Sequence, residues 1–227
     1  MENKLTDVKT PDSFTEQQQT LYQTASVLAL ITIFYNLFEG LVSIYFGFED
    51  DTLSLFGFGI DSFVEVISGV GIWHMTQRLR QNHDASSDRF EKQALKITGT
   101  AFYLLAAGLT ATAAINLYQG HSPETTFWGI VVSLVSIFTM GLLIRYKVKV
   151  GKALSSDAIL ADANCTKTCL YLSFALLLSS AAYELTGIGQ VDSVGALCIS
   201  YFALKEGQES FEKAKSGKSC SCHACQN

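Results

Sequence analysis

The chain has 227 residues, of which 48% are hydrophobic and only 16% are charged, and its formal net charge at pH 7 is −5. Soluble domains carry about 25% charged residues. The mean hydropathy is +0.25, and the charges are gathered into short blocks between long apolar runs. This pattern argues against a soluble domain, and we expect no nucleic-acid partner. It indicates an all-α protein that crosses a membrane several times.

Six apolar runs follow one another along the chain, and they are interpreted as six membrane spans, since a helix needs about 20 residues to cross a bilayer. Residues 1–20 precede them and are expected to form a flexible cytoplasmic tail without a signal peptide. Residues 21–206 are predicted to form a six-helix transmembrane bundle, and residues 207–227 a cytoplasmic cysteine-rich tail. The spans are expected at about residues 25–48, 52–75, 97–118, 125–146, 153–185 and 192–204.

The 16 lysines and arginines predict the orientation of the bundle. Two lie in the N-terminal tail, five between the second and third spans, four around the basic connector from Lys147 to Lys152, and four after the sixth span. The remaining one is Lys167, inside the fifth span. Because positively charged loops stay in the cytoplasm, both termini are predicted to be cytoplasmic. We expect a multi-pass protein in the lipid bilayer of the plasma (inner) membrane.

Two carboxylates, Asp61 and Glu65, lie four residues apart in the second span and therefore on one face of a helix. One ionised Asp at the bilayer centre costs about 2.5–3.5 kcal/mol. Two such neighbours require a water-filled path, a bound cation or protons. They belong to a stripe of small and polar residues, which predicts that this face points into the bundle. A protonated or hydrogen-bonded pair that serves only packing is the alternative.

The fifth span carries a matching stripe, in which Cys165 and Cys169 are also four residues apart, next to Asp162. If the two faces meet, two oxygens and two sulfurs converge, which is the ligand count of a tetrahedral site for zinc or a softer metal. Ordinary packing of small residues is the alternative for the cysteines. Lys167 is predicted to point away from the thiol face and not to bind substrate.

Three further residues are candidates for outer-shell partners of this site or for a pathway to it: Asn36 and Glu39 in the first span, and Asp162 in the fifth. The C-terminal tail packs four soft metal ligands close together, and a flexible tail could bind a thiophilic ion with them or have no role. These tail residues are Cys220, Cys222, His223 and Cys225.

Together these features resemble the cation diffusion facilitator family of divalent-metal transporters. In that family the second span offers His or Asp and then Asp four residues on, the fifth offers His and then Asp, and these four bind the metal. The resemblance implies a metal site at Asp61, Glu65, Cys165 and Cys169, no catalytic residues and no enzyme activity. The segments that carry it are residues 61–65, 161–169, 189–196 and 203–207.

The resemblance implies a transporter that exports a divalent thiophilic ion, such as zinc or cadmium, from the cytoplasm. Metal binding to carboxylates and thiols expels protons, so alternating access to one site would make the protein a proton-coupled antiporter. The metal is cargo and no cofactor is expected. Zn(II) is the first candidate and Cd(II) or Hg(II) the next, while Mn(II) and Mg(II) are disfavoured because they prefer oxygen ligands.

The chain is expected to be a short, membrane-only form that lacks the family's C-terminal cytoplasmic domain, and homodimer formation stays open. Two other functions also stay open. One is a membrane thiol redox protein that uses Cys165 and Cys169. The other is a metal sensor or scaffold that binds through its tail.

Overall fold

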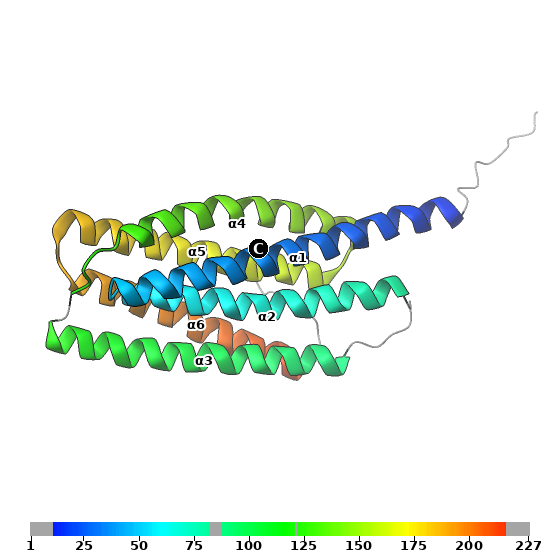
Figure 1. The fold of residues 1–227 in the computed structure, drawn as a ribbon. Helices are drawn as coiled ribbons and strands as arrows, with labels where there is room; N and C mark the ends of the chain where they lie inside the picture. The colour runs from blue at the N-terminus through cyan, green and yellow to red at the C-terminus, as the bar shows by residue number, and fades with distance from the viewer. Residues whose placement is uncertain (1–10, 82–87, 121, 217–227) are drawn as a thin grey trace, which may run out of the picture.

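The computed structural model describes residues 11–81, 88–120 and 122–216. These residues form an elongated bundle whose helices run roughly along one common direction (Figure 1). The six helices, with no strand in the described ranges, confirm the all-α bundle predicted from the sequence. The helices are α1 (Pro11–Glu49), α2 (Leu53–Gln81), α3 (Asp88–Gln119), α4 (Phe127–Leu154), α5 (Asp157–Thr186) and α6 (Gln190–Ser216).

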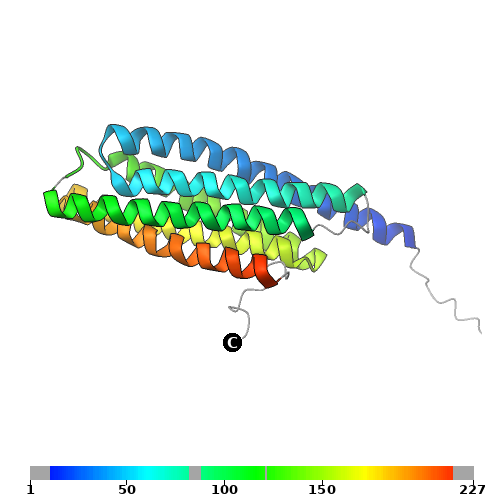
Figure 2. The same cartoon turned by 90° about the horizontal axis from the view of Figure 1, so that it is seen from below.

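In the described part of the chain, five helices, α1 to α5, are long and apolar enough to cross a membrane. The remaining helix, α6, lies along α3 in the same bundle (Figure 2). Its apolar stretch is shorter, because Asp192 lies in its first turn and Lys205 and Glu206 interrupt its second half. The sixth predicted span is therefore a helix of the bundle, but with a more polar composition than the others.

The helices extend beyond the apolar runs from which they were predicted. Residues 11–20, assigned to a flexible tail, are the first turns of α1, and residues 207–216 are the last turns of α6. The basic connector from Lys147 to Lys152 lies inside α4, and most of the charged connector from Gln77 to Lys96 belongs to α2 and α3. The reason is that Lys, Arg, Glu and Gln are good helix formers, so a helix continues past its apolar segment.

The central helix of the bundle is α2, which packs against each of the other five. The most extensive helix pairs are α1 with α2, α3 with α6, and α4 with α5. The turn between α1 and α2 is tight because of a glycine: a Cβ on Gly47 would lie 2.5 Å from the backbone nitrogen of Phe56. Only glycine permits this approach without a shift of one helix.

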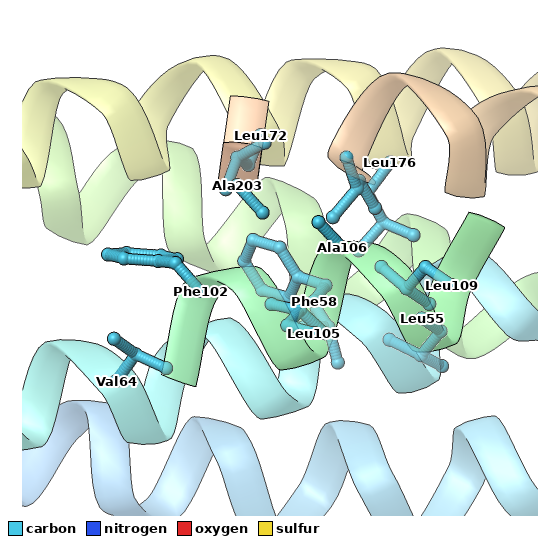
Figure 3. Packing of buried hydrophobic residues seen from close by; sticks show 12 residues of the cluster. Leu55, Phe58, Val64, Phe102, Leu105, Ala106, Leu109, Leu172, Leu176 and Ala203 are labelled. Carbon is cyan, nitrogen blue, oxygen red and sulfur yellow. The ribbon is translucent and has the colours of Figure 1, made fainter. Parts of the chain in front are cut away.

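An apolar cluster holds α2 against α3, α5 and α6 (Figure 3). Leu55, Phe58 and Val64 of α2 pack with Phe102 and its neighbours on α3, and all are buried. Residues of α5 and α6, such as Leu176 and Ala203, close the cluster. Because these contacts use apolar residues on both sides of Asp61, they fix the rotation of α2 and keep its carboxylates in the interior.

Candidate metal site

The first turn of α2 is anchored by a residue of α6. The Asp192 carboxylate accepts hydrogen bonds from the backbone nitrogens of Leu53 at 2.8 Å and Ser54 at 3.3 Å, and from the Ser54 hydroxyl. A side-chain oxygen that accepts from the free N–H groups of a helix start is an N-cap, here supplied by another helix. The anchor fixes the end of α2 that lies about two turns before Asp61.

The reversal between α4 and α5 directs the fifth helix back along the fourth. Ser155 adopts a left-handed conformation with φ 48° and ends α4. Ser156 then caps α5, its side chain accepting from the backbone nitrogen of Ile159 at 3.5 Å. Because only two residues separate the helices, α5 packs closely on α4, and its thiols enter the bundle near α2.

Asp61 of α2 and Cys169 of α5 face each other in the core of the bundle. The Cys169 thiol donates a hydrogen bond to Asp61 Oδ2 across 3.3 Å. Glu65, one turn farther along α2, also interacts with this thiol. All three side chains are buried, with exposed fractions of 2% for Asp61 and 6% for the other two. The acidic face of α2 is therefore turned toward the thiol face of α5.

Each of the two carboxylates keeps one oxygen without a hydrogen-bond partner among the described residues. These oxygens are Asp61 Oδ1 and Glu65 Oε2, and both are buried. Leaving a buried polar group unsatisfied costs about 1–3 kcal/mol, and more for a charged group. Two such oxygens, one helical turn apart and beside a thiol, are suited to hold a cation or protons.

Cys165 is half-buried on α5, one turn before Cys169. Both residues are thiols and are not joined to each other. Among the residues that the structure describes, no three His, Cys, Asp or Glu side chains lie close enough to hold a metal ion as they stand. The structure thus brings Asp61, Glu65 and Cys169 together, and a bound ion would require these side chains and Cys165 to close in. The four-ligand site stays a prediction.

The two candidates on α1 lie next to this group. Glu39 accepts hydrogen bonds from the Tyr35 hydroxyl at 2.7 Å and from the Ser62 hydroxyl at 3.1 Å. Since Ser62 follows Asp61 in the chain, Glu39 is a close neighbour of the acidic pair. Asn36 is fully buried, and its Oδ1 has no partner in the described residues. Their expected part in a pathway or outer shell stays a prediction.

The third candidate, Asp162, forms a buried ion pair that the sequence did not predict. Its Oδ2 lies 2.7 Å from Nζ of Lys147 on α4, and this ammonium also donates to Thr166 Oγ1 at 2.9 Å. Lys147 had been assigned to a connector outside the membrane. Its spacing of seven and four residues from buried Met140 and Leu143 was the signal that the inward face of α4 extends to it.

Two other expectations concern residues away from this core. Lys167 is exposed on α5, in agreement with the predicted direction away from the thiols. The four tail candidates lie outside the described residues. They are Cys220, Cys222, His223 and Cys225.

Comparison of the sequence with known protein families tests the predicted resemblance independently of the structure. The cation efflux transmembrane domain matches residues 24–216, which include the site and parts of all six helices. The chain belongs to the cation efflux family. This match confirms the resemblance to cation diffusion facilitators and, with the five membrane-crossing helices, identifies a multi-pass integral membrane protein.

Two relatives have similar sequences. An uncharacterized transporter of Methanocaldococcus jannaschii is 25% identical over 180 residues, which cover 78% of this chain and 63% of the relative. The manganese efflux system protein MneP of Bacillus subtilis is 24% identical over 145 residues, which cover 62% of this chain and 48% of the relative. The matched region of the chain therefore spans less than two thirds of the length of either relative.

Proposed function

We propose that this protein exports a divalent thiophilic metal ion from the cytoplasm across the plasma membrane, with Zn(II) as the first candidate and Cd(II) or Hg(II) next. Family membership supports a transporter of metal cations rather than an enzyme. The observation that carries the proposal is the meeting of α2 and α5: a thiol of one helix contacts a carboxylate of the other, beside two buried oxygens that have no described partner.

The contact also suggests how transport is coupled. The Cys169 thiol and Asp61 Oδ2 share a hydrogen bond, so a proton lies between the two side chains in this state. A metal ion binds thiolates and carboxylates, and its entry therefore displaces protons from the same atoms. Ion and protons exclude each other at one site. If helices α2 and α5 move so that the site opens to one side and then the other, metal export is coupled to proton entry.

Mn(II) is a second candidate cargo, because a relative is named as a manganese efflux protein. Mn(II) prefers oxygen ligands, and Asp61, Glu65 and the nearby Glu39 offer carboxylate oxygens. The central position of Cys169, buried and in contact with Asp61, favours a softer ion.

The redox alternative receives less support. It requires a bond between Cys165 and Cys169, which are both thiols here. Two cysteines four residues apart on a regular helix are poorly aimed for a disulfide. The sensor alternative depends on the tail and is separated by deletion of residues 217–227: a transporter keeps its flux, whereas a sensor loses its output.

The experiment is zinc flux into proteoliposomes that contain the purified protein, at fixed external zinc and with an imposed proton gradient. Asp61→Asn and Cys169→Ser should each reduce flux at least about tenfold, since each removes a ligand from the shared site. Lys167→Met, on the exposed side of α5, is the matched control and should transport normally. Wild-type flux in both site variants would contradict the proposal. A higher flux of Mn(II) than of Zn(II) in the wild type would identify Mn(II) as the transported ion.

A further inference from the structure

The interior of the bundle contains far more acids than bases. The buried described residues include six acids and one base, Lys147, whose ammonium pairs with one of those acids, Asp162. Its ammonium is therefore the one basic side chain that is buried in the described part of the bundle. The buried acids are Glu39, Asp61, Glu65, Asp162, Asp192 and Glu206.

The position of Lys147 is set by two contacts with α5. Its Nζ lies 2.7 Å from Asp162 Oδ2 and 2.9 Å from Thr166 Oγ1. Transfer of both charges out of water is costly, and apolar residues of similar volume often join two helices equally well or better. The need to connect α4 with α5 therefore does not explain why this pair is ionic.

The pair occupies a particular level of the bundle. Asp162 precedes Cys165 by three residues and Cys169 by seven, which corresponds to about 4.5 Å and 10.5 Å along the helix axis. It is thus nearer to the end of the bundle where α4 turns into α5 and where α2 also ends (Figure 1). This end carries the basic segments and is predicted to face the cytoplasm. An ion that enters from there reaches the level of Asp162 before that of the thiols.

The ammonium also contacts the stretch of α5 that carries the candidate thiols. It donates to Thr166, which follows Cys165 in α5, while its ion-pair partner Asp162 lies three residues before Cys165. A lysine has a flexible four-carbon stem, so its head group can leave Asp162 without a movement of the helix and expose the negative charge of that carboxylate.

We infer that Lys147 is a built-in competitor for the transported ion: its ammonium occupies Asp162 until an incoming divalent cation displaces it. Asp162 then receives the ion first and passes it to the α2–α5 site. A monovalent ion gains nothing over the ammonium, whereas a divalent ion has twice its charge at the same carboxylate. The pair thus selects for divalent cations. This inference rests on the proposed function.

The test compares Lys147→Gln, Lys147→Arg and the double variant Lys147→Gln with Asp162→Asn, using zinc flux in proteoliposomes. Glutamine removes the charge and keeps a hydrogen-bond donor for Asp162 on a side chain that is one bond shorter than that of lysine. In Lys147→Gln, the apparent KM for zinc should be about tenfold below the wild-type value, and in Lys147→Arg it should equal the wild-type value. In the double variant, the apparent KM should no longer be lowered. Lys149→Met, at an exposed position of α4, is the control.

Zinc-dependent thermal protection, measured in micelles on the same samples, gives a second reading that does not require turnover. It should be larger for Lys147→Gln than for wild type. An apparent KM for zinc at or above the wild-type value, together with zinc-dependent thermal protection no larger than that of wild type, would overturn the inference. A pair with only a structural role predicts that result. If the wild type moves zinc, such a result defeats this inference alone; if the wild type moves no metal, the proposed function fails with it.

Discussion

The carboxylate of Asp192 joins α6 to the first turn of α2, and its removal should destabilise the whole bundle. Asp192→Ala leaves the backbone nitrogens of Leu53 and Ser54 without their acceptor, at a site where Asp192 itself is only 2% exposed. Loss of an N-cap costs about 0.5–2 kcal/mol, and a hydrogen bond to a charged group contributes about 1.5–3 kcal/mol. Because the bonds share one carboxylate, we expect the free energy of unfolding to fall by about 2–4 kcal/mol.

The assay is thermal unfolding of the purified protein in detergent micelles. For a chain of this size, the expected loss lowers the midpoint by roughly 4–16 °C. Asp192→Asn keeps one acceptor oxygen and should lose about 1 kcal/mol or less. Gln190→Ala, at an exposed position of the same turn, is the matched control and should melt with the wild type. An Asp192→Ala variant with the wild-type midpoint would refute the anchoring of α2 by α6.

Two further predictions concern helix contacts and the thiols. Gly47→Ala should lower the free energy of unfolding by about 1–3 kcal/mol, because the new Cβ would lie 2.5 Å from the Phe56 nitrogen. Gly141→Ala, with open space around its Cβ, should be neutral or stabilise by up to about 1 kcal/mol in the same thermal melts. Equal losses of stability in the two variants would contradict the close approach of Gly47 to α2. Cys169→Ser should raise the apparent KM for Cd(II) transport more than Cys165→Ser, since Cys169 contacts Asp61 and Cys165 is only half-buried. The reverse order would be evidence against this arrangement.

Much of the fold follows from apolar runs whose length matches a bilayer. The helices themselves were predictable for that reason, and so was the interior position of Asp61, because a membrane penalises a carboxylate that faces lipid. Helix ends were less predictable. The charged segments on either side of residues 82–87 and the segment that begins at Lys147 are helical, because hydropathy reports where a helix leaves the apolar layer and not where the helix ends.

The candidate site was predictable where one helix determines it. The spacing of Asp61 and Glu65 places both on one face of α2, and the structure shows that face turned toward Cys169. Contacts that depend on how two helices are rotated against each other were not predictable. The pair of Lys147 with Asp162 is set by the packing of α4 on α5, and the cap supplied by α6 joins residues 138 or more positions apart.

X-ray absorption of the protein loaded with one equivalent of Zn(II) tests most directly whether α2 and α5 hold one shared ion. The cysteines of the C-terminal tail are first replaced by serine, so that Cys165 and Cys169 remain as candidate sulfur ligands with the exposed Cys198. The account predicts a mixed first shell, with sulfur at about 2.3 Å and oxygen at about 2.0–2.2 Å. Sulfur should disappear when both thiols of α5 become serine, and oxygen should decrease in Asp61→Ala. A shell of oxygen and nitrogen alone in the parent protein would contradict the account.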